Sequence, residues 1–187
     1  MLRLQSDNSF DGEVIVHEGR LEIRAPFALG TTNAGTIVRN GASLRIQGVD
    51  LDLWEPLTLS GLGTSSGPNN GALVLNRNAG IWNLYGPITL DGGARISSYN
   101  ANMSTTFVHQ AISGTGDLRL QAGAANNGGT IFVLLGQSTY TGDTYVELGA
   151  STNVVVVLAT NQALPATTVL RMEAGSFGAG LSAISRV

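Results

Sequence analysis

The sequence predicts an all-β protein built as a three-sided parallel β-solenoid, and three observations lead to this prediction. Short apolar–polar–apolar triplets recur along the chain, as at 21–23 and 44–46. Glycine or asparagine separates the triplets, and glycine accounts for 25 of the 187 residues. No window sustains the i, i+3, i+4, i+7 apolar spacing of an amphipathic helix.

Each triplet is interpreted as a short strand with one buried face. In an extended chain the outer two side chains point one way and the middle one points the other way. A triplet therefore buries two apolar residues and exposes one polar residue. In chain order, the expected strands lie at 14–16, 21–23, 36–38, 44–46, 51–53, 57–59, 73–75, 88–90, 118–120 and 131–135.

The strands repeat in phase. Val14 aligns with Thr36, and Leu21 aligns with Leu44 after a single insertion. The same strand–turn–strand outline recurs around Gly92 or Gly93, Gly116, Gly149 and Gly175. Three short strands in each repeat predict one coil of a solenoid, whose aliphatic pairs are buried only when coils stack.

An antiparallel sandwich is the rival fold. It would use tight hairpin turns, and suitable dipeptides occur at Asn40-Gly41, Asn70-Gly71, Asp91-Gly92 and Asn127-Gly128. A hairpin meander has no reason to repeat its inward pattern in phase, so the repeat favours the solenoid. The solenoid makes one sharp local prediction: Glu22 and Arg45, the middle residues of equivalent triplets, should face solvent side by side as an ion pair.

Composition excludes several function classes. The chain has 10 basic and 13 acidic residues, no cysteine, and arginine as its only basic residue apart from two histidines. A disulfide framework, a thiolate metal site and Schiff-base chemistry are excluded. There is no basic cluster, so no nucleic-acid partner is expected. No apolar run approaches the ~18 residues that span a bilayer, so no membrane insertion by this segment is expected.

Asp50, Asp52 and Trp54 are the candidate ligand-binding residues. The two aspartates alternate with apolar residues, so they should share the outer face of one strand, with Trp54 close by to stack on a sugar ring. The alternative is that both aspartates are only the polar half of an amphipathic strand. A weak Ca²⁺ or acid site there remains a further alternative, but no metal or cofactor is predicted.

The other aromatic and histidine residues leave two interpretations open. Trp54, Trp82, Tyr85 and Tyr99 would form either an exposed strip for contacts or buried packing at corners. His17 and His109 lie outside any metal-binding spacing and are interpreted as solvated turn residues.

A longer repeat carries a family resemblance. Residues 136–144, with Tyr140, Thr141, Gly142 and Thr144, resemble the autotransporter-associated β-strand repeat, whose signature is G-x-N-T-Y-T-G-x-T. Ser138 stands where that family usually has Asn. A more divergent copy near the start of the chain includes Phe10 and Gly12. The chain would then be a single solenoid over 1–187, with about one and a third long repeats starting near 8 and 138.

The resemblance implies a right-handed parallel β-helix from a large exported bacterial surface protein. It implies no catalytic residues, so we expect a structural stalk or scaffold segment at the cell surface rather than an enzyme. Its expected partners are the rest of a longer solenoid or further copies, joined end to end as filaments. No export signal is seen in residues 1–20. The alternatives are an adhesin module that binds surface glycans or proteins of a host or neighbouring cell, and a β-helix polysaccharide lyase or hydrolase.

Overall fold

The chain folds as a right-handed parallel β-helix with three sides, as the triplet pattern and the resemblance predicted. The computed structural model describes residues 1–48, 51–64, 70–76, 80–99, 102–123, 129–148, 153–173 and 182–185. Strand pairs among these residues are parallel, which excludes the antiparallel sandwich for this part of the chain. No helix long and apolar enough to cross a membrane occurs in the same residues.

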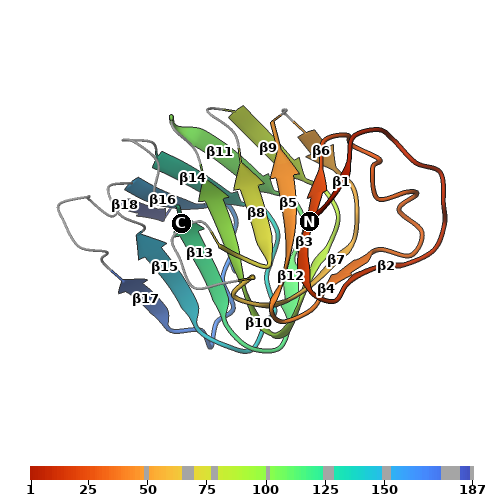
Figure 1. The fold of residues 1–187 in the computed structure, drawn as a ribbon. Coiled ribbons are helices and arrows are strands. Elements are labelled where there is room, and N and C mark those ends of the chain that lie inside the picture. Colours follow the sequence, from red (N-terminus) through yellow and green to blue (C-terminus); the bar gives the residue numbers. More distant parts are fainter. Residues whose placement is uncertain are drawn as a thin grey trace.

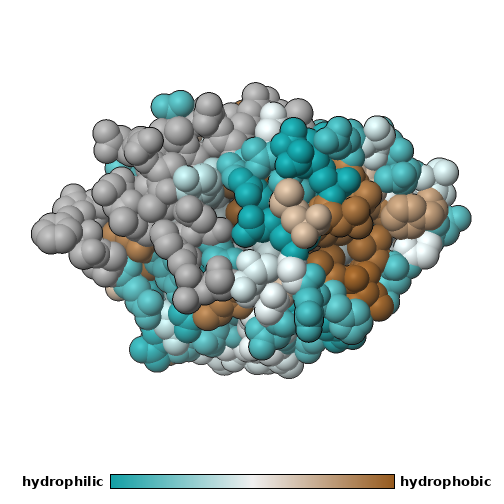
Figure 2. All heavy atoms as spheres, in the orientation of Figure 1, coloured by the Kyte–Doolittle hydropathy of each residue, from teal (hydrophilic) through white to brown (hydrophobic). Residues whose placement is uncertain are grey.

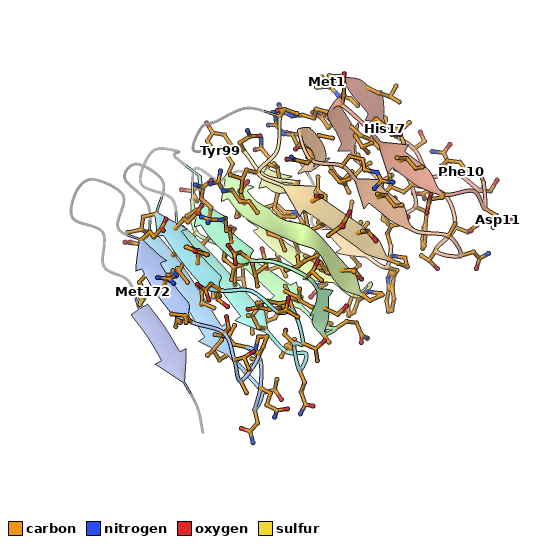
Figure 3. All side chains as sticks on the ribbon, turned by 90° about the horizontal axis from the view of Figure 1, so that it is seen from below. Met1, Phe10, Asp11, His17, Tyr99 and Met172 are labelled. Atoms are coloured by element: carbon orange, nitrogen blue, oxygen red, sulfur yellow. The ribbon has the colours of Figure 1, made fainter. Side chains whose placement is uncertain are left out.

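The first side is a ladder of eight strands, which run side by side from right to left in Figure 1. Their order is β1 (Leu2–Leu4), β3 (Gly19–Ile23), β5 (Ala42–Gln47), β8 (Leu73–Asn76), β10 (Ile88–Tyr99), β13 (Leu118–Ala122), β15 (Thr144–Leu148) and β17 (Leu170–Glu173). Met1, Phe10 and His17 lie at one end of the solenoid and Met172 at the other (Figure 3).

The second side is shorter and continues from the first through β10. It consists of β2 (Val14–Val16), β4 (Thr36–Val38), β7 (Leu57–Gly61), the first part of β10, and β12 (Ile112–Gly114). β10 turns the corner between the two sides at Gly92 and Gly93, whose φ angles are 78° and 98°. These lie in the left-handed region that glycine adopts without steric cost, so the strand bends there without ending.

The third side is a separate six-stranded sheet. Its strands are β6 (Leu51–Leu53), β9 (Gly80–Leu84), β11 (Ser104–Val108), β14 (Gly129–Leu134), β16 (Asn153–Leu158) and β18 (Ser182–Ser185). Figure 1 shows this sheet above and behind the first side.

The predicted register is confirmed. Val14 lies opposite Thr36 in the β2–β4 ladder, and Leu21 lies opposite Leu44 in the β3–β5 ladder. The single insertion is therefore absorbed at the corner between the second and first sides. Because side chains alternate along a strand, a one-residue slip would have turned every buried residue outward.

Stacked aliphatic side chains fill the interior. One inward column of the first side contains Leu21, Leu44, Leu73, Ile96, Leu120 and Val146. Trp82 and Phe132 enter the same core from the third side, and both are fully buried. Burying a side chain of this size stabilises the fold by about 1.5–3 kcal/mol, so the column supplies much of the driving force for stacking.

Glycines also let successive corners touch. A Cβ built on Gly142 would lie 2.3 Å from the carbonyl carbon of Gly116, and one on Gly116 would lie 2.3 Å from that of Gly92. No side chain fits at such distances. The corner between the second and first sides is therefore a column of glycine backbone in this part of the solenoid.

Candidate functional site

Three rings form a stack on the outer surface of the third side. Trp54, Tyr85 and His109 each follow a strand of that side, and the ladders bring them into line because Leu53 lies opposite Leu84. The ring centroids of Trp54 and Tyr85 are 4.2 Å apart, and those of Tyr85 and His109 are 4.1 Å apart. Strands in a parallel sheet are spaced by about 4.8 Å, so one ring per coil builds a stack.

A chain of polar side chains runs beside the rings. Asn83 Nδ2 donates to Asp52 Oδ1 at 2.8 Å, and His109 Nε2 lies 3.0 Å from Asn83 Oδ1. Because a carbonyl oxygen only accepts, this geometry places a proton on His109 Nε2. Asp52 therefore orients Asn83, and Asn83 orients the histidine ring that ends the stack.

The structure places two of the three predicted ligand-binding residues together. Asp52 and Trp54 point outward from β6 and its end, and both are exposed. Asp50 lies outside the described residues. Sequence reasoning missed Asn83, and it named Tyr85 only as one of four aromatic residues without placing it beside Trp54. A signal for both residues was present in the sequence. Asn83 and Tyr85 flank Leu84 in the same way as Asp52 and Trp54 flank Leu53, and Leu53 lies opposite Leu84 in the ladder.

The aromatic residues divide between the two predicted interpretations. Trp54 is 51% exposed, whereas Trp82 is fully buried in the core and Tyr99 lies on the first side. For His109 the prediction of a solvated turn residue was wrong: its ring stacks on Tyr85 and bonds to Asn83, because its coil brings it level with both. His17 is exposed next to a turn.

The arrangement offers a rigid, flat ring face beside a carboxylate. Stacked rings lose little conformational freedom when a ligand covers them, and an exposed indole face suits the C–H surface of a sugar or an apolar side chain. Among the residues that the structure describes, no group of three His, Asp or Glu side chains is placed to hold a metal ion.

Ion pairs bind neighbouring coils together on the outer face of the first side. Glu147 is buried, and its carboxylate lies 2.6 Å from Arg119 Nη1 and 2.9 Å from Arg95 Nε. Burial lowers the pKa of Arg119, but the hydrogen bond and charge of Glu147 outweigh it, so the pKa is raised overall. The Arg119 guanidinium also lies 3.8 Å from the ring centroid of Tyr145. The cluster links β10, β13 and β15.

The predicted exposed ion pair between Glu22 and Arg45 was wrong in its contacts. The two residues do lie opposite each other in the ladder, but Glu22 is only 3% exposed. Its Oε1 is 2.6 Å from Arg3 Nε and 2.9 Å from Arg24 Nε. Arg3 precedes Glu22 in the same ladder and Arg24 follows it on the same face, so these two guanidinium groups cover the carboxylate.

The signature residues have structural contacts. Tyr140 is 1% exposed, and its hydroxyl hydrogen-bonds to Thr144, which in turn lies 2.9 Å from Thr168. Thr141 is exposed at the adjoining corner, and Gly142 stacks on the backbone of the coil before it.

The divergent first copy of the signature is placed differently. Phe10 is 43% exposed, and a Cβ on Gly12 would meet nothing within 4 Å. The strand that follows the first copy, β2, lies on the second side, whereas the strand after the second copy, β15, lies on the first side.

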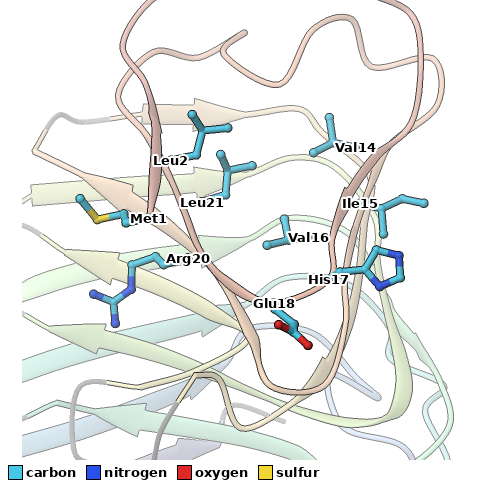
Figure 4. A pocket seen from close by; sticks show the side chains of 9 residues that line it. All are labelled: Met1, Leu2, Val14, Ile15, Val16, His17, Glu18, Arg20 and Leu21. Carbon is cyan, nitrogen blue, oxygen red and sulfur yellow. The ribbon is translucent and has the colours of Figure 1, made fainter.

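An apolar hollow of about 670 Å³ opens at the end of the solenoid formed by β1, β2 and β3. Figure 2 shows apolar atoms gathered over β1 and β2, and Figure 4 shows Leu2, Leu21 and Val16 facing the hollow. Leu2 is 63% exposed and Ile15 is 44% exposed. Among the described residues, β1 and β2 each pair along one edge, to β3 and β4.

These features define a three-sided β-solenoid that carries a ring stack on one side and ion-paired ladders on another. Comparisons with protein-family models, with curated proteins and with solved structures found no significant match. The resemblance to the autotransporter-associated repeat therefore stays a prediction from the sequence.

Proposed function

We propose that this chain is a structural stalk or scaffold segment of a larger secreted or surface-displayed bacterial protein. One observation carries the proposal: the parallel ladder of the first side continues from β1 to β17 along the described chain, with the ladders of the second and third sides beside it over parts of that length. Such a stack makes a stiff rod whose backbone groups are paired, which suits extension away from a cell and resistance to proteases.

Surface labelling tests this proposal in the source organism. Antibodies raised against the chain should label intact cells as strongly as permeabilised cells, with a known cytoplasmic protein as the negative control. Labelling that appears only after permeabilisation would overturn the proposed location, and with it the stalk role.

End-to-end contact is part of the same proposal. The hollow at β1 and β2 offers apolar side chains beside strand edges that no described strand pairs with, which a further coil or a second copy would cover. The mass in solution, measured by light scattering from low to high concentration, should rise for the parent chain. The variants Leu2→Glu and Val14→Glu should stay monomeric, because both side chains face the hollow in Figure 4. Phe27→Glu places the same charge at an exposed site outside the hollow, so it should associate like the parent. A monomeric parent at high concentration would remove self-association.

Glycan or protein binding through Trp54 and Asp52 is the second candidate function. The exposed face of the Trp54–Tyr85–His109 stack supports it. On a glycan array, Trp54→Ala should abolish any signal that the parent chain gives. Phe27→Ala, which removes an exposed ring elsewhere, should retain it. An array with no signal for the parent, or one that Trp54→Ala leaves unchanged, would overturn the glycan-binding candidate while leaving the stalk proposal intact.

A further inference from the structure

A second hollow, of about 260 Å³, lies on the outer face of the first side and spans four successive coils. Its lining comprises Arg20 of β3, Arg45 of β5, Val74 and Asn76 of β8, and Tyr99 at the end of β10. Figure 3 labels Tyr99 at the end of β10.

The hollow exists because a short side chain stands among long ones. Val74 lies opposite Arg45 in the β5–β8 ladder and is 2% exposed. Asn76 and Tyr99 lie opposite each other in the next ladder and form the wall at the ends of β8 and β10. Val74 thus forms the floor of the hollow. The guanidinium of Arg45 lies on one side of it, and the amide of Asn76 and the phenol of Tyr99 lie on another.

The two arginines are the unusual feature. The Nε atoms of Arg20 and Arg45 are shielded from solvent and have no hydrogen-bond partner among the residues that the structure describes. Neither guanidinium forms an ion pair within the described part of the chain, in contrast to Arg3, Arg24, Arg95 and Arg119 on the same side. Glu22, the nearest candidate counter-ion, is already bound to Arg3 and Arg24.

Among the described residues these two like charges have no counter-ion, and such a pair destabilises the folded chain. Burial and the charge of Arg20 lower the pKa of Arg45, and the opposing effects of Glu22 and Tyr99 do not offset them. An anion placed between the guanidinium groups would remove both penalties, because planar N–H forks match the oxygens of carboxylate, sulfate and phosphate groups.

We propose that the Arg20–Arg45 hollow binds an oxyanion group, with Asn76 and Tyr99 available to hydrogen-bond to polar groups attached to it. This site is separate from the ring stack on the third side and does not depend on the stalk role. Its ligand class is defined by the shared chemistry of carboxylate, sulfate and phosphate.

The direct test is a titration of the chain observed through the arginine Nε–H resonances in NMR, at constant ionic strength. Sulfate, phosphate and glucuronate are the probes, with glucose as the neutral analogue of glucuronate and chloride as the screening control. Saturable shifts at Arg20 and Arg45 with at least one oxyanion are expected, and the preferred probe identifies which oxyanion the hollow accepts. Shifts that chloride reproduces, or no saturable shift with any oxyanion, would overturn the proposal.

Variants separate binding from folding. Arg20→Gln and Arg45→Gln should each weaken binding at least tenfold, while Arg39→Gln, which removes an exposed charge outside the hollow, should leave it unchanged. Because the pair has no counter-ion in the described part of the chain, Arg20→Gln and Arg45→Gln should melt at or above the temperature of the parent chain in the absence of oxyanion. Val74→Met keeps both charges and fills the floor, so it should also weaken binding. Unchanged affinity in all three hollow variants would contradict the proposal.

Discussion

Glu147 on β15 lies 2.9 Å from Arg95 Nε on β10, although strand β13 separates their strands. The same carboxylate also binds Arg119 on the intervening strand. One buried acid therefore neutralises two arginines and fixes three coils relative to one another.

Removal of that acid should be costly. We expect Glu147→Gln to lower the free energy of unfolding by about 3 kcal/mol, because it removes the carboxylate that pairs with the mostly buried Arg95 and leaves Arg119 only Asp117, at 3.8 Å. Urea unfolding, monitored by circular dichroism, measures this loss of unfolding free energy. Asp91→Asn is the matched control: its side chain is 57% exposed and 3.8 Å from Arg39, so its effect should stay within about 0.5 kcal/mol. Equal effects of the two variants would show that the cluster does not hold the coils.

The two copies of the signature should differ in their response to truncation. Tyr140→Ala empties a buried site and removes a hydroxyl bonded to Thr144, so we expect a loss of about 3–5 kcal/mol. Phe10→Ala removes a ring that is already 43% exposed and should cost less than about 1 kcal/mol. Thermal and urea unfolding of both variants measure the difference. A Phe10→Ala cost as large as that of Tyr140→Ala would contradict the placement of Phe10.

Corner glycines should tolerate substitution only where space exists. Gly116→Ala places a Cβ 2.3 Å from the backbone of Gly92 and forces alanine to φ +84°, so a loss of about 2 kcal/mol or more is expected. Gly12→Ala meets no atom within 4 Å and should change stability by less than about 0.5 kcal/mol. The ratio of the two effects, from melting curves, tests the backbone contact between stacked corners.

A buried glutamate should make stability depend on pH. Glu55 is 4% exposed, and burial raises its pKa, with the hydrogen bond from Thr36 Oγ1 at 2.7 Å offsetting part of the effect. The unfolded chain ionises at the ordinary value of 4.5, so the folded chain loses stability as pH rises from there through the raised pKa.

Glu55→Gln should therefore stabilise the chain at pH 7 relative to the parent, and the gain should shrink toward pH 4, where the parent is protonated in both states. The glutamine oxygen can still accept the bond from Thr36. Melting temperatures of the parent and of Glu55→Gln at pH 7 and pH 4 measure this difference in stability. Glu13→Gln, at an exposed site, is the control for the loss of one charge. A variant less stable than the parent at pH 7 would mean that the ionised carboxylate is stabilising.

The coil register could be predicted from the sequence because it depends on local periodicity. The alternation of Leu21, Glu22 and Ile23 decides which side chains point inward, and positive-φ glycines such as Gly41 mark where the chain turns. Together these place Leu21 on Leu44 without any knowledge of distant contacts. Asp52 and Trp54 could be assigned to one outer face for the same reason.

The contacts on the outer surface were decided only by the tertiary structure. Successive coils differ in length, since the step along the chain from Leu21 to Leu44 is shorter than the step from Leu44 to Leu73. No fixed period therefore brings the rings of the third side into line. Likewise, the sequence pairs Glu22 with Arg45, but competition from Arg3 and Arg24 decides which guanidinium groups bind Glu22. Inward positions follow from the alternation of side chains along one strand. Outward contacts depend on the packing of long side chains that several coils place on the same part of the surface.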